Sequence, residues 1–139
     1  MHTSGFPKKT DPTPPEIMAK RGKLFPYFKD CIGAIDGTHI PAFVPIEDRP
    51  RYRNRKKVVT QNVLAAVSFD MRFVYVVSGW EGGAADSTIL EDARATDFRV
   101  PEGKYYLADA GFPASPAMLV PFRGVRYHLH EWALARNQR

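Results

Sequence analysis

Apolar and β-branched residues gather in short runs along the middle of the chain, separated by polar or glycine-containing turns. Residues 31–35 are almost all apolar and meet Asp36-Gly37, the pattern of a buried strand that ends in a turn. Residues 60–69 and 73–80 are β-rich and flank a short polar segment, which predicts a β-hairpin. We therefore expect three early strands, with Asp36 at the carboxyl end of the first.

Helical spacing replaces the strand pattern after Gly82-Gly83. Residues 86 to about 98 carry apolar side chains at roughly helical spacing and acidic residues early, which predicts a helix of about three turns. Residues 105–108 are apolar again and stop at Asp109, followed within two positions by a glycine, as a second buried strand would. A further short strand is predicted around residues 118–120.

This order of elements predicts an α/β fold: a mixed sheet with a β-hairpin, then a crossover helix that returns to a parallel strand. If the strands before Asp36 and Asp109 are parallel neighbours, the two carboxylates converge at one end of the sheet, where open α/β sheets bind ligands. Residues 1–22 contain four prolines among charged and small residues, which predicts an extended lead-in. The domain itself is expected over residues 23–139.

Composition limits the function classes. The chain has 139 residues, 44% of them hydrophobic, which suits one domain. Its 20 Lys and Arg outnumber 15 Asp and Glu, and the net charge of +5 favours a polyanionic partner. Cys31 is the single cysteine, which excludes an internal disulfide framework and a cysteine-rich zinc site. The longest apolar runs are too short for a membrane-spanning helix, so no membrane role is expected.

The two aspartates fit phosphodiester chemistry, in which carboxylates hold magnesium ions that neutralise the phosphate and activate a nucleophile. Their spacing alone does not distinguish this role from turn formation, because Asp-Gly and Asp-x-Gly are ordinary turn sequences. Asp86 also has two interpretations: its side chain either caps the predicted helix or lies beside the metal site.

A basic run occupies residues 49–57, with six positive charges around an aromatic residue. Such a run would follow phosphates, with the aromatic ring available for stacking; a solvated basic loop is the alternative. The candidate DNA-binding residues are Arg51, Tyr52, Arg53, Arg55, Lys56 and Lys57.

Six short motifs, read together, resemble the Harbinger-type DDE superfamily of transposase-derived nucleases, from about residue 26 to residue 130. They are Ala34-Ile35-Asp36-Gly37-Thr38-His39-Ile40, Tyr52-Arg53-Asn54-Arg55-Lys56, Gln61-Asn62-Val63-Leu64, Gly79-Trp80 with Gly82 and Gly83, Asp86-Ser87-Thr88-Ile89-Leu90, and Tyr106-Leu107-Ala108-Asp109-Ala110-Gly111-Phe112.

The resemblance implies a ribonuclease-H-like fold in which the first and fourth strands lie side by side and carry the first two acids of an Asp-Asp-Glu metal triad. Those acids would be Asp36 and Asp109, and the family pattern also includes Asp86. In the family the third acid lies on a later helix, whereas Glu131 is the one acidic residue after Asp109 here and does not match that motif. The resemblance therefore implies a nuclease domain that is incomplete at its C-terminus.

The expected function is a DNA endonuclease or strand-transfer domain that depends on magnesium or manganese, acts in the nucleus, and is inactive alone if the third acid is missing. A protein partner could supply DNA recognition. The alternative is a domesticated, non-catalytic remnant that binds DNA or protein. A third possibility is an unstable product, because loss of the last helix would uncover one face of the sheet.

Overall fold

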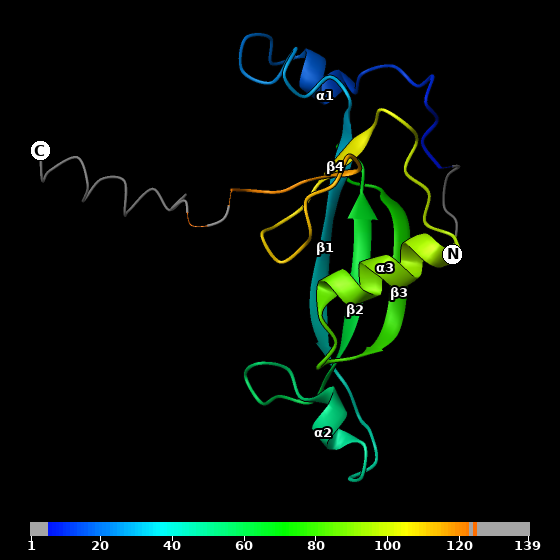
Figure 1. Ribbon diagram of the computed structural model, residues 1–139, viewed down its shortest axis with the longest axis vertical. Helices are drawn as coiled ribbons and strands as arrows, with labels where there is room; N and C mark the ends of the chain where they lie inside the picture. Colours follow the sequence, from blue (N-terminus) through cyan, green and yellow to red (C-terminus); the bar gives the residue numbers. More distant parts are fainter. Residues whose placement is uncertain (1–5, 123, 125–139) are drawn as a thin grey trace, which may run out of the picture.

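A mixed sheet organises the chain in the computed structural model, which describes residues 6–122 and 124 (Figure 1). Its strands lie in the order β3-β2-β1-β4-β5. The strands are β1 (Cys31–Pro41), β2 (Thr60–Val67), β3 (Phe73–Glu81), β4 (Tyr105–Leu107) and β5 (Met118–Leu119), and the helices are α1 (Pro15–Met18), α2 (Arg49–Tyr52) and α3 (Asp86–Thr96).

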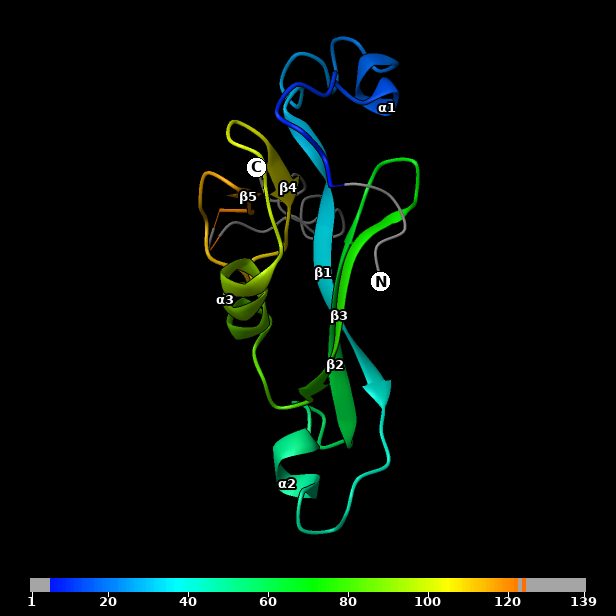
Figure 2. The same cartoon turned by 90° about the vertical axis from the view of Figure 1, so that its right-hand side faces the viewer.

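The pairing confirms the predicted fold class. β1 pairs antiparallel with β2, and β2 pairs antiparallel with β3, so the predicted hairpin is present. β1 pairs parallel with β4, and β4 pairs parallel with β5. Helix α3 makes the crossover between β3 and β4 (Figure 2). The first and fourth strands are therefore neighbours in a ribonuclease-H-like mixed sheet.

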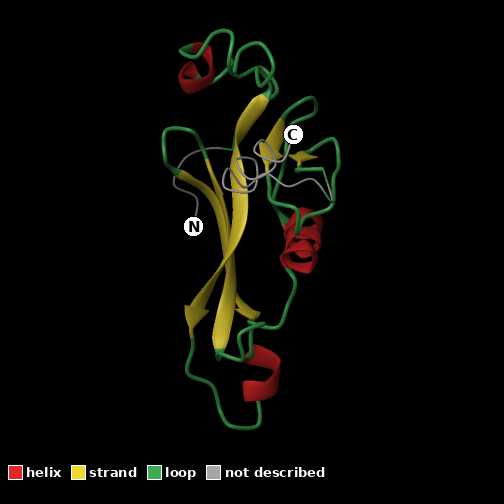
Figure 3. Cartoon of the chain, turned by 90° about the vertical axis from the view of Figure 1, so that its left-hand side faces the viewer, coloured by secondary structure: helices red, strands yellow, loops and turns green. Residues whose placement is uncertain are grey.

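Helix α3 covers one side of the long strands, as Figure 3 shows. Ile89, Leu90 and Ala93 are buried at helical spacing and join the core of the sheet. Full burial of an Ile or Leu side chain contributes about 1.5–3 kcal/mol. Phe98, just beyond the helix, stacks at 5.6 Å from Tyr106 of β4. This packing holds α3 and the segment that follows it against the sheet.

Strand β1 is longer than the sequence predicted. It runs through Asp36-Gly37 to Pro41, because β2 pairs with it as far as Pro41 opposite Thr60. The expectation that Asp36 ends its strand is therefore wrong. Beyond Ala34 no described strand pairs with the edge of β1 that faces away from β2, since β4 pairs with β1 only up to the contact of Ala34 with Leu107.

The lead-in also differs from the extended segment that was expected. It contains α1, which starts with Pro15 at a position where a helix does not need the missing N–H. Ile17 is buried, and the backbone oxygen of Asp11 accepts a hydrogen bond from Lys104 at 3.1 Å. The buried Ile17 and the bond from Lys104 thus anchor the lead-in to the rest of the fold. In the described part of the chain no helix is long and apolar enough to cross a membrane.

Candidate active site

Asp36 and Asp109 lie at the same level on adjacent chain segments. The last parallel pair of β1 and β4 is Ala34 with Leu107, and each aspartate follows its member of that pair by two residues. Neighbouring strands are about 4.8 Å apart. The register thus brings together the two acids that the sequence singled out, although Asp36 lies within its strand and Asp109 just beyond its own.

Both carboxylates also make a local turn-like hydrogen bond. Asp36 Oδ1 accepts the backbone N–H of Gly37 at 2.8 Å, and Asp109 Oδ1 accepts that of Gly111 at 2.8 Å. These bonds orient the two side chains, and each of them uses Oδ1. The turn-forming role considered from the sequence is therefore present and is compatible with a second role for the same carboxylates.

The pKa of Asp36 is raised from its ordinary value, first by partial burial of its carboxyl group. The hydrogen bond from Gly37 lowers the pKa, whereas the negative charges of Asp109 and Asp86 raise it. Three carboxylates therefore act on one another, and a cation among them would relieve this repulsion.

Asp86 does not cap α3. The N-cap residue is Ala85, and the cap makes no side-chain hydrogen bond. Instead, Asp86 Oδ1 accepts a hydrogen bond from Asn62 Nδ2 at 2.7 Å. The carboxylate lies directly over Gly37, where an added Cβ would come within 2.2 Å of Oδ1. The capping interpretation is wrong, and Asp86 is placed beside the residue that follows Asp36.

Asn62 is the residue of this site that sequence reasoning missed. Its side chain is fully buried in β2, and Nδ2 also donates to the backbone oxygen of Ala84 at 3.3 Å. Its Oδ1 is buried without a hydrogen-bond partner among the described residues. The sequence does contain a signal for this residue, because Asn62 is an amide within the apolar run of a predicted strand. A polar group buried there requires a hydrogen-bond partner.

The donor set suits a hard divalent cation, because carboxylate oxygens are the ligands that magnesium and manganese prefer. Within the described ranges, however, no group of three or more acidic, histidine or cysteine side chains is arranged to hold a metal ion. Glu131, the weak candidate for a third acid, lies outside the described residues. The described acids therefore do not make up a three-ligand metal group by themselves.

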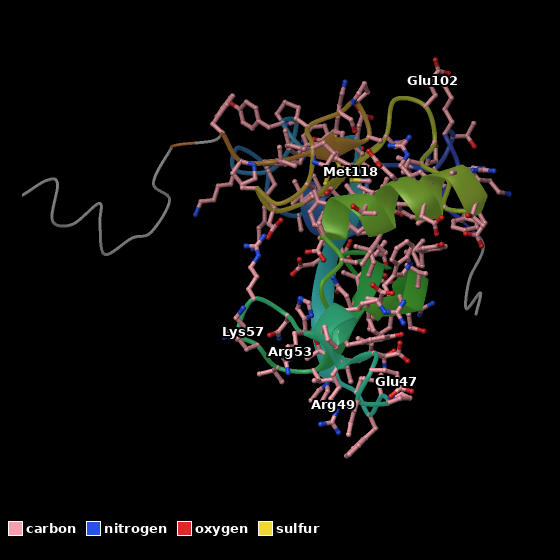
Figure 4. All side chains as sticks on the ribbon, turned by 60° about the horizontal axis from the view of Figure 1, so that its bottom comes forward. Glu47, Arg49, Arg53, Lys57, Glu102 and Met118 are labelled. Carbon is pink, nitrogen blue, oxygen red and sulfur yellow. The ribbon has the colours of Figure 1, made fainter. Side chains whose placement is uncertain are left out.

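The basic run lies at the far end of the sheet from α1, around α2 and the loop that follows it (Figure 1). Arg51 is engaged in the fold: its guanidinium pairs with Asp48 and, at 2.9 Å, with Glu81. Tyr52 is half-buried. Arg53, Arg55, Lys56 and Lys57 are exposed, as are Arg49 and Arg51. Figure 4 labels Arg53 and Lys57 on this part of the molecule, residues 49–57, which we call the basic projection.

The comparisons with known proteins agree with the motifs. The family model described as "DDE superfamily endonuclease" matches residues 35–139. A protein of Arabidopsis thaliana described as "Protein ALP1-like" is 29% identical over 142 residues, which cover 89% of this chain and 34% of that protein. The chain thus spans about a third of that relative's length. A comparison with solved structures gave no match. The match over residues 35–139 confirms the resemblance found from the motifs, and the chain belongs to the DDE superfamily endonuclease family.

Proposed function

We propose that this domain binds magnesium or manganese at Asp36 and Asp109, with Asp86 beside them, and acts on DNA phosphodiesters by hydrolysis or strand transfer. The observation that carries the proposal is the parallel register of β1 and β4, which sets Asp36 and Asp109 level on adjacent segments. The family supplies the reaction class, and the raised pKa of Asp36 supports mutual repulsion of the acids.

Each group has a distinct role in this proposal. Asp36 and Asp109 offer their carboxylate oxygens to the cation, and the bonds from Gly37 and Gly111 keep those carboxylates oriented. A divalent cation, when bound, supplies charge neutralisation at the phosphate and activation of the attacking water or hydroxyl. Asn62 holds Asp86 in place.

The basic projection would hold the DNA backbone through its exposed cations. A third acidic ligand would lie outside the described residues, since these hold no group of three metal-binding side chains. Nuclear action follows if chromosomal DNA is the substrate, and it remains a proposal. A partner protein that reads the DNA sequence also remains a prediction.

Calorimetric titration with manganese measures the affinity of the metal site and does not require catalytic turnover. We expect the 139-residue chain to bind, and Asp36→Asn and Asp109→Asn each to weaken binding by at least about tenfold, or about 1.4 kcal/mol. Asp92→Asn, an exposed acid on α3, is the matched control and should leave the affinity unchanged. Equal affinity in all four proteins would refute the assignment of the two ligands.

A non-catalytic DNA-binding domain is the second candidate. What favours it is the absence of a three-ligand metal group among the described residues, together with exposed cations on the projection. DNA binding that persists in EDTA and in Asp109→Asn, combined with failure to cleave after a C-terminal extension that restores the third acid, would support this candidate over the nuclease.

A further inference from the structure

The loop after α2 has its conformation set by its own hydrogen bonds. Asn54 Oδ1 accepts the backbone N–H groups of Lys56 at 2.9 Å and of Val58 at 3.1 Å. The N–H of Asn54 donates to the backbone oxygen of Val58 at 2.9 Å, and Arg53 forms a bridge with Val59. The loop is thus preorganised, which lowers the entropic cost of binding a ligand.

This loop and the ends of β1 and β2 enclose a groove of about 460 Å³. Its lining residues are His39, Pro41, Asn54, Arg55, Lys56, Val58 and Thr60. His39 Nδ1 lies 3.0 Å from Thr60 Oγ1, so Nε2 is the ring nitrogen that can meet a ligand. The groove therefore combines cationic, hydrogen-bonding and apolar walls.

The charge of the groove is uncompensated. Neither Arg55 nor Lys56 forms an ion pair with another described residue, in contrast to Arg51, and no acidic residue lines the groove. The two unpaired side chains, Arg55 and Lys56, favour an anionic ligand. Pro41 and Val58 offer apolar contact to the uncharged part of that ligand. A nucleotide unit of a nucleic-acid strand has both features, its phosphate and its sugar.

The stretch of β1 from Asp36 to Pro41 separates the acids from the groove, and Asp36 and His39 lie on opposite faces of that strand, so a nucleic-acid strand would reach both around its edge. Beyond Ala34, β1 has no parallel partner among the described strands, and Asp36 and Pro41, at the two ends of this stretch, are both exposed. His39 follows Asp36 by three residues, or about 10 Å along a strand. Each nucleotide of a duplex advances about 3.4 Å per strand, so about three nucleotides cover that distance.

We propose that this groove binds a backbone phosphate of the DNA strand, about three nucleotides from the phosphate that a cation bound by Asp36 and Asp109 would hold. Arg55 and Lys56 contact the phosphate, His39 donates from Nε2, and Pro41 and Val58 pack against the sugar. Phosphate binding in the groove needs no metal; the three-nucleotide spacing rests on the proposed function.

Fluorescence anisotropy with a labelled duplex, in EDTA and over a series of salt concentrations, tests the groove. Arg55→Gln with Lys56→Gln should lower the magnitude of the slope of log affinity against log salt by about 1, because both cations contact one phosphate and each neutralised phosphate contributes about 0.9. Lys20→Gln with Lys23→Gln makes the same charge change at the α1 end and should leave the slope nearly unchanged. An equal fall in both double variants would overturn the groove.

The variant Asn54→Ala distinguishes the contribution of the loop's conformation to DNA affinity from the contribution of its positive charge. This variant keeps both cations but loses two hydrogen bonds that shape the loop. We expect weaker binding with the parent's salt slope. Binding as tight as that of the parent would contradict a role for the loop's shape.

The three-nucleotide spacing is tested by mapping on one DNA duplex both the nucleotide at the groove and the nucleotide at the acids. A photocrosslinker on Lys56→Cys marks the nucleotide at the groove. Fe²⁺ bound in place of magnesium, with added hydrogen peroxide, produces hydroxyl radicals that cleave DNA near the acids. We expect the two marks about three nucleotides apart, and marks that coincide or lie a full helical turn apart would overturn the spacing. Absence of Fe²⁺ cleavage, with the salt result as expected, would refute the metal site and the spacing while the groove stands.

Discussion

The contact between Gly37 and Asp86 gives a sharp test of the site's geometry. A Cβ added at Gly37 would lie 2.2 Å from Asp86 Oδ1 and 2.5 Å from its Cγ, whereas ordinary contact starts near 3.4 Å. In Gly37→Ala the carboxylate must therefore move by roughly 1 Å, away from Asn62 Nδ2, to which it is bonded at 2.7 Å. A hydrogen bond to a charged group contributes about 1.5–3 kcal/mol, so we expect a loss of stability of that size.

A double-mutant cycle isolates this effect. The free energy of unfolding in urea would be measured for the parent, Gly37→Ala, Asp86→Ala and the double variant. Without the Asp86 carboxylate the new methyl group has room, and alanine is favoured over glycine in a strand by about 0.5–1 kcal/mol. Gly37→Ala should then be neutral or stabilising, and the coupling between the two sites should be about 1.5–3 kcal/mol.

The control is the slope of the unfolding free energy against urea concentration. This slope should be the same in all four proteins if each unfolds in one cooperative step. Additive effects, within about 0.5 kcal/mol, would mean that Asp86 does not lie over Gly37. That result would remove the geometric reason for placing Asp86 at the site and would leave Asp36 and Asp109 as its acids.

Three further outcomes follow from the packing and the charges. Asp109→Asn should lower the pKa of Asp36, because it removes one of the charges that raise that pKa; an NMR titration that shows no decrease would contradict this. Tyr75→Phe removes a 2.8 Å bond to Asp97 and should cost about 1.5 kcal/mol at neutral pH. Because the pKa of Tyr75 is raised from 10 to about 12, that contribution should be intact below pH 10 and fade as pH rises through 12; a constant difference in urea unfolding would refute it. Cys31 is fully buried, and burial raises its pKa, so alkylation should require unfolding; rapid labelling of the native chain would disprove its burial.

Local periodicity was sufficient for the hairpin and the helix. The predicted strands at 60–69 and 73–80 and the helix from residue 86 agree with β2, β3 and α3 to within two residues at most ends. In each of these elements the alternation of buried and exposed residues repeats along the element itself. A short window of sequence is therefore enough to predict whether it is a strand or a helix. The prediction that β1 ends at Asp36 was wrong because it used the same local signal. Asp36-Gly37 has a typical turn sequence, but pairing with β2 continues the strand across it.

The surroundings of Asp86 could not be read from neighbouring residues. A helix that begins with Asp-Ser predicts a capping side chain, yet the partner of Asp86 is Asn62, 24 positions away on β2. The basic run shows the same limit, since composition gives six equivalent charges, whereas Arg51 pairs with Asp48 and Glu81, and Arg55 and Lys56 form no ion pair with a described residue. Tertiary contacts decide which of several similar residues remain available to a ligand.

The glycine pair between β3 and α3 connects the two candidate surfaces. A Cβ at Gly82 would come within 2.4 Å of backbone oxygens of Thr60 and Tyr52, and the N–H of Gly83 donates to the backbone oxygen of Arg51 at 3.0 Å. The connection can lie this close to α2 only without side chains. Three residues after Gly83 the same connection delivers Asp86 to its place over Gly37. The base of the basic projection and the acidic site are therefore positioned by one short segment, so a side chain at Gly82 should displace both.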